Sequence, residues 1–153
     1  MSEVLVKYID SYLPELSKNE GDCGFDLRCV LQDTITLEPN ETYVVPTGVS
    51  IAMPNGVGGF VFPRSGLGCK GLVLRNLTGV IDSNYRGEIK VCLWNTSSTP
   101  ITIQPYDRIA QLVFLPYITP VLKAVDTLPS SERGEGGFGS TGQYEESNDG
   151  KSE

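Results

Sequence analysis

The chain has 153 residues, enough for one domain with a single core, and its 39% hydrophobic and 20% charged residues exclude wholesale disorder. It contains no histidine, which excludes histidine-dependent triads, histidine-ligated zinc and imidazole acid–base chemistry. The net charge of -7 makes nucleic acid and anionic membranes poor partners, and we expect neither. An anionic substrate must therefore be held by a local arginine cluster or a metal ion.

The N-terminal residues include Glu3, Lys7 and Asp10, so they form no apolar signal-peptide run. No stretch reaches the ~18 apolar residues of a membrane span, and we expect a cytoplasmic protein. The 4 cysteines form no C-x-x-C pair, which leaves zinc ribbons and thioredoxin-like redox sites unsupported. We expect them to be reduced thiols at buried or half-buried positions.

Short apolar runs separated by proline and glycine predict strands through most of the chain. In chain order we expect strands at 4–9, 35–37, 43–45, 49–53, 59–62, 89–94, 101–103 and 109–115. No apolar helical stripe extends over three turns, so at most one short helix, after Gly66, is expected. Prolines bound residues 117–125, which favours an edge or exchanged strand over a central one. This spacing indicates an all-β sandwich, jelly roll or barrel.

The composition changes at Ser130, where a glycine-rich run is followed by a polar, acidic end that we expect to be disordered. Glycine-rich runs are usually flexible linkers. Glycine amides beside hydroxyls can also form an anion nest that wraps phosphates. In that second interpretation, Arg133 holds a terminal phosphate and Phe138 stacks on a base.

Two further segments admit both a structural and a chemical interpretation. Residues 63–67 (P-R-S-G-L) are an ordinary turn or a phosphate site made of exposed amides and a hydroxyl. Residues 79–89 predict a β-hairpin with Asp82 and Tyr85 at its tip. Asp82 is an Asx-turn acceptor or a base for a water, Tyr85 could cover a sugar, and the hairpin backbone could bind a base edge as a third strand would. Taken singly, Asp26 and Gln111 can each be explained structurally, as a residue at a strand end or in a salt bridge.

Together, five segments in this order resemble the five motifs of the trimeric dUTP diphosphatase (dUTPase) family, most of all its bacterial and phage members. They read C-G-F-D-L, P-R-S-G-L-G, G-V-I-D-S-N-Y-R-G-E, D-R-I-A-Q-L and R-G-E-G-G-F-G-S-T-G, and they span residues 23–142. The resemblance implies a jelly-roll-like β-barrel of the β-clip type over residues 1–129, including a C-terminal exchanged strand. It also implies a flexible active-site arm at 130–143 and a disordered acidic tail at 144–153.

The resemblance further implies Mg²⁺-assisted hydrolysis of dUTP to dUMP and pyrophosphate, which keeps uracil out of DNA and supplies dUMP for dTMP synthesis. Asp82 would activate the water that attacks the α-phosphorus, Tyr85 would pack on the deoxyribose and exclude UTP, and Asp26 would act through Mg²⁺-bound water. Uracil recognition is implied for the backbone of Gly79, Val80, Ile81 and Lys90 and for the Asn76 side chain. Phosphate contacts are implied for Arg64, Ser65, Gly66, Gln111, Arg133, Ser140 and Thr141, with Phe138 stacked on uracil and Gly139 allowing close approach.

The family resemblance also implies a homotrimer whose active sites each use three subunits. The hairpin would come from one subunit, the segments of Asp26, Ser65 and Gln111 from a second, and the arm from a third. Two alternatives remain: a dCTP deaminase or bifunctional deaminase–diphosphatase of the same fold, and a regulatory trimer that binds a protein partner. The complete arm and Tyr85 favour the diphosphatase. Four positions depart from the family pattern: Val57, Asn84, Tyr106 and Glu135.

Overall fold

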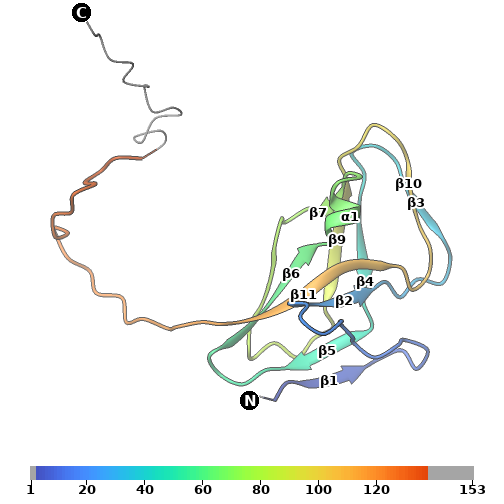
Figure 1. The fold of residues 1–153 in the computed structure, drawn as a ribbon, viewed down its shortest axis with the longest axis horizontal. Coiled ribbons are helices and arrows are strands. Elements are labelled where there is room, and N and C mark those ends of the chain that lie inside the picture. Colours follow the sequence, from blue (N-terminus) through green and yellow to red (C-terminus); the bar gives the residue numbers. More distant parts are fainter. Residues whose placement is uncertain (1–2, 138–153) are drawn as a thin grey trace, which may run out of the picture. The chain divides into compact units, whose positions relative to one another are not determined.

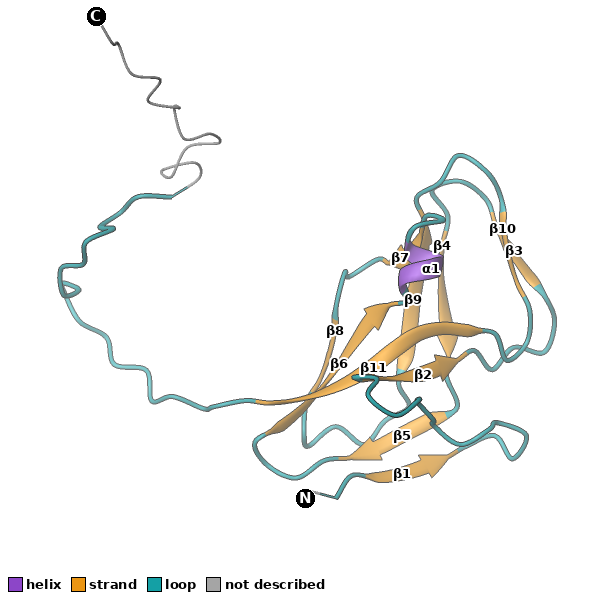
Figure 2. Cartoon of the chain, in the orientation of Figure 1, coloured by secondary structure: helices purple, strands orange, loops and turns teal. Residues whose placement is uncertain are grey.

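The structure is a computed structural model that describes residues 3–137, and Figures 1 and 2 show its fold. It divides into two units, one up to Thr119 and one from Pro120 onward. The first unit holds every strand and helix of the described residues. The elements are β1 (Leu5–Tyr8), β2 (Gly24–Arg28), β3 (Ile35–Leu37), β4 (Thr42–Pro46), β5 (Val49–Ala52), β6 (Val57–Pro63), α1 (Ser65–Gly68), β7 (Leu72–Leu74), β8 (Gly79–Ile81), β9 (Lys90–Asn95), β10 (Ile101–Ile103) and β11 (Arg108–Pro116).

The strands pair antiparallel in four sheets, ordered β1-β5, β10-β3, β2-β11-β6-β8 and β4-β9-β7. Figure 1 shows the long strand β11 running beside β2 and β6. Because β11 is paired on both sides, it brings residues from three distant parts of the sequence onto one sheet. This sheet carries most of the candidate site.

Buried and outward-facing side chains alternate along the strands, and the buried ones form the core. In β9, Val91, Leu93 and Asn95 are buried, while Lys90 and the other alternate residues face outward. Leu27 and Leu112 contribute fully buried side chains from β2 and β11. Each such leucine stabilises the fold by about 1.5–3 kcal/mol relative to an exposed one. Burial of these leucines therefore determines which face of β2 and of β11, the strands that carry the candidate site, points into the core.

The all-β, jelly-roll-like prediction with at most one short helix is confirmed, and α1 begins at Ser65, one residue before Gly66. All eight expected strands are present, but β2 and β7 were not predicted as strands. The predicted hairpin at 79–89 is wrong as a two-stranded ladder. Strand β8 pairs with β6, whereas β9 pairs with β4 and β7, so residues 79–90 connect two sheets. We call these residues the 79–90 segment.

Residues 117–125 form no strand, so the prediction of an edge strand within the chain is wrong. In the first unit, the Tyr117 N–H donates to the Gly56 carbonyl at 2.9 Å. In the second unit, Val121 and Leu122 are 96% and 90% exposed. Exchange of this strand with another copy stays a prediction. The predicted acidic tail, 144–153, lies outside the described residues.

All four cysteines are free thiols. Cys29 is buried and Cys92 half-buried, as expected, whereas Cys23 and Cys69 are exposed, which corrects the prediction for those two. Burial raises the pKa of the Cys29 thiol because it disfavours the thiolate. Within residues 3–137, no helix is long and apolar enough to cross a membrane.

Candidate active site

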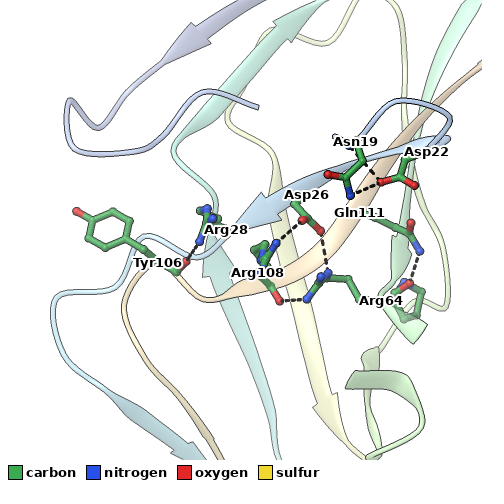
Figure 3. A network of polar contacts seen from close by, with 9 residues as sticks. Asn19, Asp22, Asp26, Arg28, Arg64, Tyr106, Arg108 and Gln111 are labelled. Carbon is green, nitrogen blue, oxygen red and sulfur yellow. Dashed lines mark hydrogen bonds and ion pairs between the residues drawn. The ribbon is translucent and has the colours of Figure 1, made fainter. Parts of the chain in front are cut away.

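The sheet register places Asp26 and Gln111 next to each other. Asp26 in β2 lies directly opposite Gln111 in β11, and Gln111 also lies opposite Phe62 in β6. The Gln111 side chain donates from Nε2 to the Pro63 carbonyl at 2.9 Å, as Figure 3 shows. A Cβ on Gly24 would lie 2.7 Å from Gln111 Oε1, so glycine is needed for this close approach. The first, second and fourth motifs therefore meet at Gln111, and the third motif begins in β8 of the same sheet.

Two arginines share the carboxylate of Asp26 (Figure 3). Arg64 Nε lies 2.8 Å from Oδ1, and Arg108 Nη1 lies 3.3 Å from Oδ2. Arg64 also donates to the Arg108 carbonyl at 3.4 Å. The β2–β11 register shifts between Arg108 and Ala110, and such irregularities redirect side chains. Arg108 was not among the predicted site residues, and its only sequence signal is its place in the D-R-I-A-Q-L motif.

A cleft of about 680 Å³ opens around this pair of arginines. Its lining residues are Ser17, Lys18, Asn19, Asp22, Cys23, Gly24, Asp26, Arg64, Ser65, Gly66, Arg108 and Gln111. The lining carries three cations and two carboxylates, in a chain whose net charge is -7. A Cβ on Gly66 would meet nothing within 4 Å, and the first amides of a helix have no intrahelical partner. The cleft therefore has the charge and the donors that a polyphosphate needs.

The 79–90 segment forms a second, smaller pocket of about 220 Å³. It is lined by Val80, Ile81, Asp82, Tyr85, Glu88, Ile89 and Lys90. Typical pockets for drug-sized ligands measure about 300–1,000 Å³, so this one suits a ring or a sugar better than a whole nucleotide. Strand β8 is the last strand of its sheet, and its outer edge leaves backbone groups open to a ligand.

Gly79 and Asn76 lie beside each other at the start of β8. A Cβ on Gly79 would lie 3.2 Å from the Val61 Cβ and 3.9 Å from Asn76 Nδ2. The Asn76 amide donates to the Thr78 carbonyl at 3.4 Å, a long bond that a better acceptor can replace. This geometry is compatible with the predicted role of both residues, although Asn76 does not line the smaller pocket.

Asp82 and Tyr85 lie on one turn at the mouth of the smaller pocket. The Tyr85 N–H donates to the Asp82 carbonyl at 3.0 Å, which closes the turn. Among the side-chain hydrogen bonds of residues 3–137, none uses the exposed Asp82 carboxylate, which disfavours an Asx-turn. Tyr85 folds back so that its hydroxyl donates to the Glu88 carbonyl at 3.0 Å. A Cβ on Gly87 would overlap the Tyr85 ring, so a larger residue there would displace the ring from this position.

Glu88 and Ile89 attach the 79–90 segment to the turn between β4 and β5. Glu88 Oε1 accepts the Gly48 N–H at 2.8 Å, and the Ile89 N–H donates to the Val49 carbonyl at 2.8 Å. The Thr47 hydroxyl donates to the Ile89 carbonyl at 2.7 Å. Sequence reasoning missed Glu88, since its partner is 40 positions away. Its backbone and side chain together support Tyr85.

The cleft and the smaller pocket have no lining residue in common, so one chain does not unite them in a single cavity. In the second unit, Arg133 is exposed and donates from Nε to the Gly136 carbonyl at 2.7 Å. The predicted site residues Phe138, Gly139, Ser140 and Thr141 lie outside the described residues. Of the positions that depart from the family pattern, Asn84 and Glu135 are exposed and Val57 is half-buried in β6 opposite Pro116.

An all-β, jelly-roll-like chain with a cationic cleft and a separate small pocket defines a protein suited to a phosphorylated small molecule. The family model for dUTPase matches residues 13–142, and the chain belongs to the dUTPase family. The chain is 47% identical to the deoxyuridine 5'-triphosphate nucleotidohydrolase of Neisseria meningitidis serogroup B, over 93% of this chain and 98% of the relative.

Solved phage structures agree with this assignment. A dUTPase of Staphylococcus bacteriophage 80alpha with dUPNHPP has a TM-score of 0.82 at 32% identity, over 92% of this chain and 98% of that one. A mutant dUTPase of the S. aureus phage phi11, described with a structural Mg(II) ion, has a TM-score of 0.75 at 27% identity, over 84% and 99%. The expected likeness to bacterial and phage members is confirmed.

Proposed function

We propose that this dUTPase hydrolyses dUTP to dUMP and pyrophosphate, with Asp82 as the base that activates the attacking water. The proposal rests on the position of the Asp82 carboxylate, which lines the smaller pocket together with Tyr85. This carboxylate is exposed and makes no side-chain hydrogen bond among the described residues. A carboxylate can orient a water and accept its proton when nothing else occupies its lone pairs. The pyrophosphate then leaves as the α-phosphorus gains the water oxygen.

The smaller pocket is the proposed site for the nucleoside. The open edge of β8, at Gly79, Val80 and Ile81, offers backbone donors and acceptors to the uracil edge, joined by the Lys90 backbone and the Asn76 side chain. Tyr85 is half-exposed and would pack against the deoxyribose, where a 2′-hydroxyl would clash with the ring. Different residues of this one segment of the chain therefore select the base and the sugar.

The cleft is the proposed site for the triphosphate. Arg64, Ser65, Gly66 and Gln111 would contact phosphate oxygens, and we add Arg108 because it lies beside Arg64. Charge stabilisation of this kind supplies most of the rate in phosphoryl chemistry.

Mg²⁺ is the proposed cofactor. Within residues 3–137, no three acidic, cysteine or histidine side chains are placed so that they could hold a metal ion together. The described part of the chain therefore provides no complete set of metal ligands. Each Asp26 oxygen keeps a second lone pair beside its arginine, which fits contact through a metal-bound water. When bound, the ion would neutralise charge on the phosphates. The structural Mg(II) of the phi11 relative is compatible with this proposal.

The active sites are proposed to be shared within a homotrimer. One copy would present the 79–90 segment, a second its cleft, and a third its arm with Arg133, Phe138, Gly139, Ser140 and Thr141. The absence of a shared lining residue between the two pockets supports this arrangement. Exposed apolar side chains at Ile118, Val121 and Leu122 support strand exchange, since pairing with another copy would bury them. We retain the division into a core at 1–129, an arm at 130–143 and a tail at 144–153.

The direct test is incubation of the pure protein with Mg²⁺ and each deoxynucleoside triphosphate in turn, with pyrophosphate and nucleoside monophosphate measured. We expect dUMP and pyrophosphate in equal amounts from dUTP alone. Absence of pyrophosphate with dUTP contradicts the proposal, and consumption of dCTP would instead indicate a deaminase.

Deletion of the residues after Ser130 tests the arm. We expect the truncated chain to keep the mass of a trimer and its melting temperature, because the core lies before this point. Its turnover of dUTP should fall steeply, since the arm would no longer cover the phosphates. Normal turnover by the truncated trimer would exclude the arm from catalysis.

A further inference from the structure

We propose that Lys18 is an additional phosphate-binding residue, which takes the terminal part of the substrate's triphosphate and the same groups of the pyrophosphate product. The inference rests on the proposed function, because it assigns the cleft to phosphates. Lys18 belongs to the loop between β1 and β2, which lines the cleft together with Arg64 and Arg108. No motif of the sequence includes this lysine.

Two contacts hold the Lys18 side chain at the cleft. Its Nζ donates to the Asp22 carbonyl at 2.6 Å and lies 5.7 Å from the centroid of the Phe25 ring. Phe25 precedes Asp26 in β2 and packs edge-on against Phe114, with ring centroids 5.9 Å apart. The aliphatic stem of a lysine packs on apolar surface of this kind while its ammonium group stays in water. The ammonium is therefore kept near the cleft before any ligand arrives.

Lys18 is the cation of the cleft that pairs with no carboxylate among the described residues. The two arginines share the single carboxylate of Asp26. The other carboxylate, Asp22, accepts from the Asn19 backbone N–H at 3.2 Å and from its side-chain amide at 3.0 Å. Among the salt bridges of residues 3–137, none involves Lys18, whose ammonium binds only a neutral carbonyl. An arriving phosphate can replace that carbonyl without breaking an ion pair.

An ammonium group is a point charge with three donors, which suits a terminal phosphate oxygen that changes position during the reaction. Lys18 is exposed, so its contribution is that of a solvent-screened ion pair. Such a contact acts on bound substrate and transition state alike, and its loss raises KM without lowering kcat. We expect a rise in KM of about three- to fivefold when the charge is removed.

The experiment compares Lys18→Met with Lys7→Met. Methionine keeps an apolar stem over Phe25, and both variants change the net charge of the chain equally. Lys7 lies on β1 and lines a different depression of the surface. We expect Lys18→Met to raise the KM for dUTP at unchanged kcat and to weaken the salt dependence of kcat/KM. Lys7→Met should match the parent, and Lys18→Arg should restore the parental KM.

Inorganic tripolyphosphate, titrated by calorimetry, tests Lys18 independently of turnover. We expect its Kd to rise by the same factor in Lys18→Met as the KM does. An unchanged KM together with an unchanged tripolyphosphate affinity would overturn the proposal, as would a loss of kcat at constant KM. If the parent protein hydrolyses no dUTP but Lys18→Met still weakens tripolyphosphate binding, the proposed function fails while the assignment of Lys18 stands.

Discussion

Tyr106 shows how one side chain can offset an unfavourable backbone. Its φ is 63°, in the left-handed region that favours glycine. Its hydroxyl donates to Asp10 Oδ2 at 2.9 Å, and Arg28 donates to its carbonyl at 2.9 Å. The tyrosine therefore ties the loop before β11 to the N-terminal segment, a contact that glycine cannot make.

The Tyr106–Asp10 bond predicts a pH-dependent stability. The carboxylate of Asp10 raises the pKa of Tyr106 above its ordinary 10.0, so the folded chain holds this proton more tightly than the unfolded one. Its stabilisation is complete below the ordinary pKa and is lost as pH rises through the raised pKa. Tyr106→Phe should therefore lower the urea midpoint at about pH 8, and this deficit should shrink as the pH rises beyond 10.0. A deficit that does not change with pH would contradict this.

Asp82 allows the sharpest test of the chemistry. Asp82→Asn keeps the size of the side chain but removes the proton acceptor, so dUTP binding should persist while kcat falls by about 10²–10⁴-fold. Binding is measured by calorimetry and turnover by pyrophosphate release. Asp33→Asn is the matched control, because Asp33 is also exposed and lines neither pocket. Near-normal kcat in Asp82→Asn would remove Asp82 as the base.

At the scale of elements, the attachment of the 79–90 segment to the β4–β5 turn should govern sugar selection. Glu88→Ala removes the acceptor for the Gly48 N–H and should loosen Tyr85, whereas Glu88→Gln keeps an acceptor oxygen there. We expect Glu88→Ala to reduce the preference for dUTP over UTP, as a ratio of kcat/KM values, by about tenfold. Glu88→Gln should retain most of this preference.

Glu41→Ala is the control for Glu88, because Glu41 also accepts a backbone N–H, that of Glu38, but lies outside both pockets. It should lower stability without changing the ratio. Equal ratios for Glu88→Ala and the parent would show that Tyr85 is positioned without Glu88.

The sequence predicted which segments form strands better than it predicted which strands pair with one another. Alternating apolar residues were enough for eight strands, but β7 has only three residues, and β2 carries Asp26 and Arg28 where alternation alone predicts little. The hairpin at 79–89 was mispredicted because periodicity indicates a strand without indicating its sheet. The motifs located Asp26, Arg64, Asp82 and Gln111. The contacts of Arg108 and Glu88 join residues 82 and 40 positions apart, and no local pattern encodes them.

At the scale of the whole molecule, sharing of active sites between subunits predicts complementation. Asp82→Asn and Arg64→Ala should each be inactive alone. After unfolding in urea and refolding together, random mixed trimers should recover about a quarter of the parental activity, because an intact Asp82 and an intact cleft then meet at that fraction of sites. Each variant refolded alone is the control. No recovery, or a monomeric mass in solution, would show that each chain forms its own site.

The Asp26 carboxylate has a consequence for how ligands come and go. In the free chain it already pairs with both Arg64 and Arg108, so both guanidinium groups are held in place before a nucleotide arrives, although only one of their two charges is neutralised. If these arginines bind phosphates as proposed, substrate entry is an anion exchange, in which a phosphate displaces a resident carboxylate. The free energy of this exchange is therefore the difference between the arginine–phosphate and the arginine–carboxylate interactions, rather than the full arginine–phosphate interaction. On the same proposal, the reverse exchange would speed pyrophosphate release, because the displaced carboxylate would stay tethered beside the arginines at high local concentration.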